Sequence, residues 1–92
     1  MKNYKLLKIR KKLDKLDDKF LVLIKKRTLL VNQVLKTKKL KKEIVDKKRI
    51  KTILSNIKKK SQKRNIDTKI TTSIWKSMIQ AFINYEFRNF KK

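Results

Sequence analysis

Glycine, proline, cysteine and histidine are all absent from this sequence of 92 residues. Without glycine or proline, tight hairpin turns lose the residues that usually form them, which disfavours a sheet of several strands. The prevailing residues, lysine, leucine, isoleucine and arginine, mostly tolerate or favour helix. We therefore predict an all-α fold, in a single domain that spans residues 1–92.

The lack of cysteine and histidine excludes several classes of chemistry. Disulfides and thiol nucleophiles need cysteine, Ser-His-Asp triads need histidine, and the common zinc sites need one or both. Any catalysis must therefore rely on Lys, Arg, Asp, Glu and hydroxyl groups. We expect neither a metal nor another cofactor.

Long apolar runs are also missing. No apolar stretch reaches the roughly 18 residues that a membrane-spanning helix needs. Residues 1–12 also lack the uninterrupted apolar run and the cleavage site of a secretory signal. We expect a cytoplasmic protein that has no membrane partner.

The chain is strongly basic, with a formal net charge of +23. Clustered lysines and arginines are typical of proteins that bind nucleic acids or anionic membranes. Lysine on solvated faces is also what compositional drift in an AT-rich genome produces. Because the lysines are spread along the whole chain, the second interpretation is favoured, and we expect no specific nucleic-acid partner.

An apolar seam runs through residues 6–34, with steps that alternate between three and four residues. Its members are Leu6, Ile9, Leu13, Leu16, Phe20, Leu23, Arg27, Leu30 and Val34. This heptad pattern predicts a long helix that packs along other helices. A helix of thirty or more residues would be about 45 to 50 Å long. Since two shorter helices cannot cover both of its sides, we expect a homodimer that shares one core.

Arg27 is the one charged member of this seam. A guanidinium keeps its charge, and burying it without a partner costs several kcal/mol. Arg27 either pairs with an acid of residues 14–18 on a partner chain or lines a cavity for an anionic ligand. Lys38 favours the cavity, because it follows eleven residues later, within about 20° of the same helical face. Arg10 lies about 100° around the helix from Arg27 and would have to serve such a ligand from another subunit.

A second helix is predicted over residues 47–63. Residues 41–48 are strongly polar and break the heptad, which indicates a loop, and Asp46 is a suitable N-cap. Arg49 adjoins the apolar face of this helix and could reach a site near its start. That face comprises Ile50, Ile53, Leu54 and Ile57.

Asp67 can cap a third helix over residues 68–90. One apolar edge consists of Ile70, Ile74, Met78 and Ala81, and a second stripe of Trp75, Ile79, Phe82, Glu86 and Phe90. Core packing accounts for the aromatic side chains. Glu86 either forms a salt bridge with Arg88 or a lysine, or takes part in a site. Its apolar neighbours favour the neutral acid, whereas a nearby cation would favour the carboxylate.

Four short motifs resemble, in order and spacing, those of the all-α (type II) chorismate mutases. Residues 9–17 are similar to the family's arginine followed by I/L-D-x-I/L-D, and residues 23–30 to its L-L-x-R-x-x-L. Residues 34–38 are similar to V-x-x-x-K, and residues 44–49 match part of P-V-x-D-x-x-R-E. The resemblance covers residues 6–90, which is nearly the whole chain.

The resemblance implies three helices per chain, a long first helix, and an intertwined homodimer whose active sites are shared between chains. It implies that Arg27 and Lys38 bind the carboxylate and ether-oxygen groups of chorismate, a dianion. Arg10 would reach into the site of the partner chain. Asp46 and Arg49 would border the end of the pocket that receives the ring hydroxyl.

Three positions depart from the family pattern. Ile50 stands where glutamate normally contacts the ring hydroxyl, Glu43 replaces the loop proline, and Phe82 replaces a small polar residue. Glu86 falls where many members carry glutamine beside the ether oxygen. The related isochorismate-pyruvate lyases share the fold and the cationic residues, and an apolar Ile50 with an aromatic-rich last helix resembles that branch. A mutase is the favoured reading and a salicylate-forming lyase the alternative.

The mutase reaction suits the composition, because the rearrangement of chorismate to prephenate is pericyclic and needs no nucleophile or metal. We expect Lys38, helped by a neutral Glu86, to stabilise charge that grows on the ether oxygen. Arg27, with Arg10 from the other chain, would fix the two carboxylates. A basic nucleic-acid-binding protein would explain the charge but not the ordered motifs. A structural coiled coil would explain the heptads but not Arg27.

Overall fold

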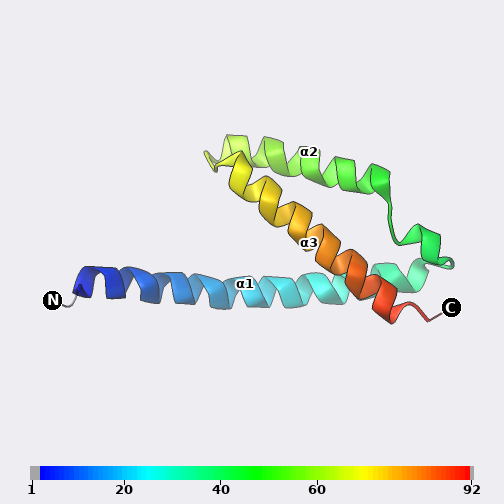
Figure 1. The fold of residues 1–92 in the computed structure, drawn as a ribbon, viewed down its shortest axis with the longest axis horizontal. Helices are drawn as coiled ribbons and strands as arrows, with labels where there is room; N and C mark the ends of the chain where they lie inside the picture. Colours follow the sequence, from blue (N-terminus) through cyan, green and yellow to red (C-terminus); the bar gives the residue numbers. More distant parts are fainter. Residues whose placement is uncertain (1–2, 92) are drawn as a thin grey trace. The chain divides into compact units, whose positions relative to one another are not determined.

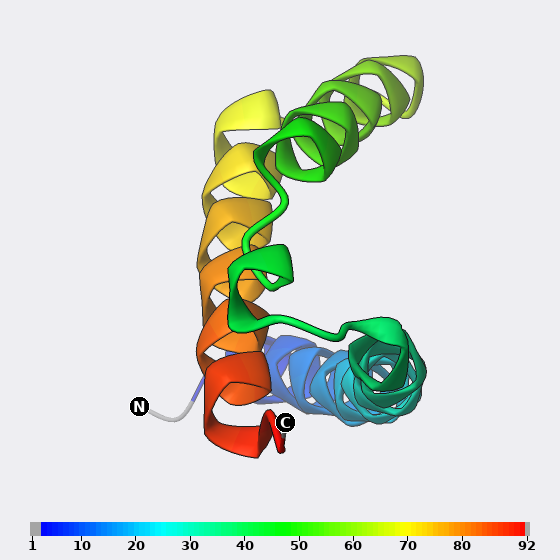
Figure 2. The same ribbon diagram turned by 90° about the vertical axis from the view of Figure 1, so that its right-hand side faces the viewer.

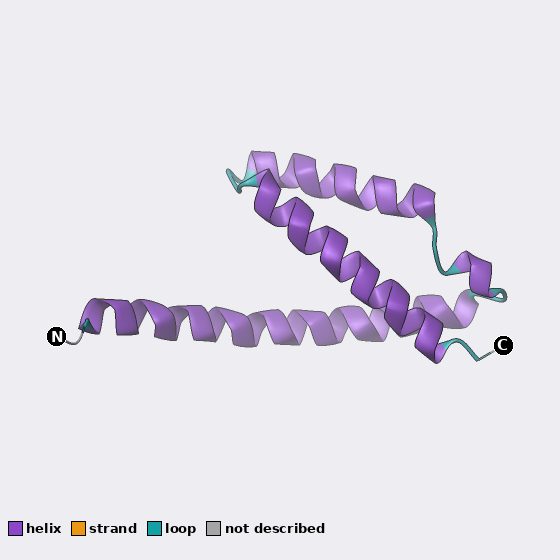
Figure 3. Cartoon of the chain, in the orientation of Figure 1, coloured by secondary structure: helices purple, strands orange, loops and turns teal. Residues whose placement is uncertain are grey.

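The computed structural model describes residues 3–91, and the backbone over this range is helical with short connections (Figures 1 and 3). Its elements are α1 (Tyr4–Thr37), the short 3-10 helix η1 (Lys41–Glu43), α2 (Lys47–Lys63) and α3 (Thr68–Asn89). No strand occurs among the described residues, so the prediction of an all-α chain with three helices is confirmed. Within residues 3–91, none of the helices combines the length and apolar character needed to cross a membrane.

The connection between α1 and α2 is more ordered than the expected loop over residues 41–48. The 3-10 helix η1 ends at Glu43, whose carboxylate accepts a hydrogen bond from the amide of Lys39 at 2.9 Å. Helix α2 spans Lys47–Lys63, the range predicted from the sequence. It begins there because Asp46 caps it, with Oδ1 accepting the amide of Arg49 at 3.0 Å.

The other helix boundaries also follow from local chemistry. Asp67 caps α3, because its Oδ1 accepts the amide of Lys69 at 2.8 Å. At the end of α2, Asn65 adopts a positive φ of 55°, a conformation that asparagine tolerates better than most residues. The amides of Asn65 and Ile66 then donate to the carbonyls of Gln62 and Ser61, which is a Schellman motif. Both caps predicted from the sequence are therefore confirmed.

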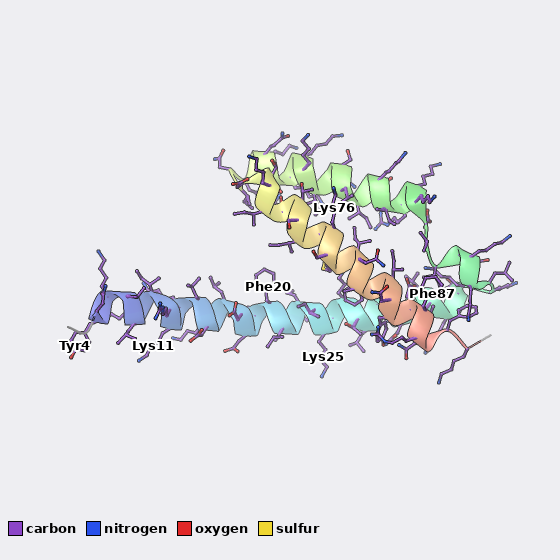
Figure 4. The ribbon with its side chains drawn as sticks, in the orientation of Figure 1. Tyr4, Lys11, Phe20, Lys25, Lys76 and Phe87 are labelled. Atoms are coloured by element: carbon purple, nitrogen blue, oxygen red, sulfur yellow. The ribbon has the colours of Figure 1, made fainter. Side chains whose placement is uncertain are left out.

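Contacts within the chain divide it into two units, residues 1–31 and residues 32–92. The described part of the first unit is one stretch of α1, and no side chain in it is buried. Side chains such as those of Tyr4, Lys11 and Phe20 project from this helix (Figure 4). The apolar members of the seam are between 39% and 60% exposed. A lone helix cannot cover its own apolar stripe, so the expected dimer stays a prediction that this exposure supports.

The second unit contains the end of α1, together with η1, α2 and α3. Helices α2 and α3 pack against each other and are joined by the turn after α2 (Figures 1 and 2). The apolar face predicted for α2, which includes Ile50, is half-buried along its length. On α3, the stripe that contains Trp75 and Glu86 is half-buried to buried, whereas Ile70 and Ile74 remain 55% and 44% exposed. Of the two apolar edges predicted for α3, the chain itself therefore covers mainly the stripe that contains Trp75 and Glu86, and leaves much of the other edge exposed.

Removal of the α3 cap tests how far this second unit depends on local capping. Asp67→Ala deletes the acceptor for the Lys69 amide and should lower the free energy of unfolding by about 1 kcal/mol. Asp67→Asn keeps a side-chain oxygen at the cap and should lower the free energy of unfolding by only a small fraction of that amount. Urea unfolding, followed by helical circular dichroism at one fixed protein concentration, compares the three proteins. Equal stability of the alanine variant and the wild type would contradict the prediction.

Candidate active site

Lys38 and Glu86 form a nearly buried ion pair in the second unit. Lys38 directly follows α1, and its Nζ lies 2.9 Å from Oε1 of Glu86 on α3. The two side chains are only 15% and 8% exposed. The ammonium group also donates to the backbone carbonyl of buried Ile44, at 3.4 Å. Removing a charge from water costs solvation free energy, and a close contact with an opposite charge offsets that cost.

The pair identifies the partner of Glu86 among the alternatives that the sequence left open. Lys38 fills this role, although it lies 48 residues away along the chain. Arg88, the other candidate, places its guanidinium 6.0 Å from the centroid of the Tyr85 ring, a cation–π arrangement. The neutral form expected of Glu86 stays a prediction.

A second contact between α1 and α3 lies next to the pair. The Tyr85 hydroxyl donates to Oδ1 of Asn32 at 2.7 Å, and the rings of Tyr85 and Phe82 meet edge to face, with centroids 6.4 Å apart. Sequence reasoning missed both Asn32 and Tyr85. Their separation of 53 residues leaves no periodic signal that could have connected them. Together with the ion pair, this hydrogen bond holds the end of α1 against the last turns of α3.

A cavity of about 430 Å³ opens beside these contacts, a size typical of sites for small molecules. Three of its lining side chains are lysines, one of them Lys38, and no acid lines it. Its lining residues are Asn32, Leu35, Lys36, Lys38, Tyr85, Asn89, Phe90 and Lys91. A cationic cavity with apolar walls is suited to a small anionic ligand. Lys38 is the one residue of the sequence-predicted site that lines it.

The three site residues predicted at the start of α2 do not line this cavity. The Asp46 carboxylate serves as the helix cap through its bond to the Arg49 amide. The Arg49 side chain is exposed, and Ile50 is half-buried. Phe82, on α3, is half-buried against Tyr85. The proposed role of these residues at a ring hydroxyl stays a prediction.

Arg10 and Arg27 belong to the first unit, and the other six predicted site residues to the second. Arg10 is exposed. Arg27 is half-buried, in contrast to its seam neighbours Leu23 and Leu30, which are each 60% exposed. The roles predicted for the two arginines stay predictions. Among residues 3–91, no group of three or more His, Cys, Asp or Glu side chains is placed to hold a metal ion.

Comparison with known protein families gives a match that covers most of the chain. The family model described as chorismate mutase type II matches residues 9–87. This range includes all four motifs noted in the sequence and every predicted site residue. Neither the curated proteins nor the solved structures contain a match to this chain.

Proposed function

We propose that this chain, which belongs to the type II chorismate mutase family, catalyses the rearrangement of chorismate to prephenate in the cytoplasm. The observation that carries the proposal is the ion pair of Lys38 and Glu86, with 2.9 Å between Nζ and Oε1. The resemblance to the family implies that these two positions lie at the ether oxygen of the substrate. Their side chains come from distant parts of the chain and meet at one nearly buried point.

In the proposed reaction, the ether C–O bond of chorismate breaks while a new C–C bond forms within the same molecule. No group is transferred to the protein, so its task is to hold the reactive conformer and to stabilise charge. Lys38 donates to the ether oxygen as negative charge grows there. Arg27 of one chain and the partner's Arg10 bind the two carboxylates. Asp46 and Arg49 border the end that receives the ring hydroxyl.

Glu86 has two successive roles in this proposal. Without substrate, its carboxylate neutralises the nearly buried ammonium of Lys38. When the dianionic substrate arrives, a second anionic group beside the developing charge on the ether oxygen would be unfavourable. Protonation of Glu86 removes that repulsion and creates an O–H donor for the same oxygen. Activity should then depend on the protonation of Glu86.

The homodimer belongs to the same proposal. The first unit has no buried side chain among residues 3–31, and the apolar seam of α1 is exposed along its length. An apolar stripe on a helix of 34 residues is typical of a surface that another helix covers. A second copy of the chain would supply that helix and would bring its Arg10 to the site. Residues 1–92 would then form one domain around a shared core.

Isochorismate-pyruvate lyase activity is the second candidate, and two side chains favour it. Ile50 is apolar and half-buried where the mutases carry a glutamate that contacts the hydroxyl. Phe82 fills a position on α3 that is small and polar in the family, and it packs on Tyr85. Isochorismate carries its hydroxyl elsewhere on the ring, so the apolar Ile50 would not leave that hydroxyl without a hydrogen-bond partner. The lyase would form salicylate and pyruvate in the same cationic site.

The choice between the two activities is tested by offering both substrates to the purified protein. We expect the loss of chorismate absorbance to exceed the turnover of isochorismate, with prephenate as the product. Arg27→Ala should keep the helical circular dichroism but lose at least about nine-tenths of kcat/KM, equivalent to about 1.4 kcal/mol or more. Arg64→Ala, at the end of α2, is the matched control. Faster conversion of isochorismate would establish the lyase, and no turnover of either substrate would refute both.

Subunit sharing is tested by mixing two inactive variants. Arg10→Ala and Lys38→Ala should each be inactive alone, because each homodimer lacks one required cation at both sites. Refolded together in equal amounts, they should recover about a quarter of wild-type activity, since half of the dimers contain one intact site. The proportion of heterodimers is measured by native mass spectrometry. Abundant heterodimers without recovered activity would show that Arg10 does not complete the site of the other chain.

The role of Glu86 as a hydrogen-bond donor is tested by two substitutions. Glu86→Gln supplies a permanent donor to the ether oxygen and should keep most of the wild-type kcat/KM. Glu86→Ala has no donor and should lower kcat/KM strongly, while circular dichroism checks that both variants stay helical. If Glu86→Gln is as slow as Glu86→Ala, Glu86 is only the ion-pair partner of Lys38.

A further inference from the structure

A second hollow lies between α2 and α3. This lysine groove, as we call it, has a volume of about 750 Å³ and includes residues from the first turns of α3. Its cationic side chains are Lys58 of α2 and Lys69 and Lys76 of α3, all three exposed. Lys76 is labelled in Figure 4, on the part of α3 that faces α2. Four hydroxyl side chains, among them Thr72 and Ser73, also line it.

The lining of the lysine groove is positively charged. No acid lines the groove, and its three lysines form no salt bridge among the described residues. Of the acids of residues 32–92, Glu86 pairs with Lys38, whereas the carboxylates of Glu43, Asp46 and Asp67 accept backbone amides. Asp67 directly precedes Thr68 and Lys69 of the lining. Three ammonium groups on one hollow repel each other, and a multivalent anion would relieve that repulsion.

The lining indicates the chemical class of the anion. Ammonium and hydroxyl groups both donate hydrogen bonds, and phosphate oxygens accept them strongly. Two linked phosphates at the end of a small molecule carry about three negative charges near neutral pH, which matches three lysines. No aromatic side chain lines the groove. It therefore lacks the stacking surface on which proteins hold the bases of single-stranded nucleic acids.

Two lining residues of the lysine groove lie on the far side of α3 from its exposed apolar edge. Thr72 and Lys76 follow Ile70 and Ile74 by two residues each, about 200° around the helix. Lys76 and Glu86 are ten residues apart on α3, about 15 Å along its axis. Occupation of the groove is thus separate from the candidate active site.

We propose that the lysine groove binds the diphosphate group of a small molecule. Lys58 approaches the diphosphate from α2, and Lys69 and Lys76 approach from α3. The hydroxyl groups of Thr72 and Ser73 donate to the remaining phosphate oxygens. Free pyrophosphate and a nucleoside diphosphate present the same chemistry to these groups, so the test below includes both.

Calorimetric titration of the full-length protein with inorganic pyrophosphate, without magnesium, tests the proposal. We expect one pyrophosphate per chain. The triple variant Lys58→Gln, Lys69→Gln, Lys76→Gln should weaken binding at least about tenfold. The control triple Lys59→Gln, Lys60→Gln, Lys63→Gln changes the neighbouring surface of α2 and removes equal charge, and should change affinity less than about twofold. Circular dichroism checks that each variant is helical. If a triple variant is not helical, the corresponding single variants are titrated in its place.

Further titrations separate the sources of the ligand. Equal affinity for pyrophosphate and adenosine diphosphate, with weaker binding of adenosine monophosphate, supports recognition of the diphosphate alone. Adenosine diphosphate that binds at least about tenfold more tightly than pyrophosphate supports a nucleotide as the source. Equal weakening in the two triple variants would overturn the proposal, because binding would then follow the net charge. Absence of saturable binding, or a single-stranded oligonucleotide that pyrophosphate cannot displace from the groove, would also overturn it.

Discussion

The pairing of Glu86 with Lys38 is the interaction on which the second unit depends most. Glu86 is 6% exposed, so its carboxylate has given up most of its contact with water. Only a close cation can offset that loss, and the Lys38 ammonium at 2.9 Å does so. Because Lys38 follows α1 and Glu86 lies near the end of α3, the pair ties these two elements together. The hydrogen bond between Tyr85 and Asn32 adds a neutral tie beside it.

The same pair gives the candidate site its chemical character. A lone lysine would present a full positive charge to any ligand, whereas the Lys38 ammonium already donates hydrogen bonds to the Glu86 carboxylate and to the carbonyl of Ile44. In the proposed mutase reaction, the substrate's ether oxygen has to compete for this ammonium. Under this proposal, Glu86 both holds the second unit together and acts at the ether oxygen.

Few apolar side chains are buried among the described residues. Contacts with another molecule would therefore add much to the buried apolar area. Leu35 and Ile44 are the buried apolar side chains among residues 3–91, and three buried residues are polar or charged. Much of the apolar surface lies instead on the seam of α1 and on the exposed edge of α3. A second copy of the chain is the proposed cover. The lysines that dominate the rest of the surface leave most of it hydrated, and in the lysine groove they gather without an acid.

The sequence by itself determined the three long helices and, to within one residue, the boundaries of α2 and α3. Caps such as Asp46 and Asp67 act on amides two or three residues away, and apolar periodicity is a property of one helix, so both can be read locally. It also singled out Lys38 and Glu86, although separately. Only the tertiary structure decided that these two side chains meet, that Asn32 holds Tyr85, and which edge of α3 is covered. These contacts join residues about 50 positions apart and exist only because the end of α1 packs on α3, an arrangement that no local pattern encodes.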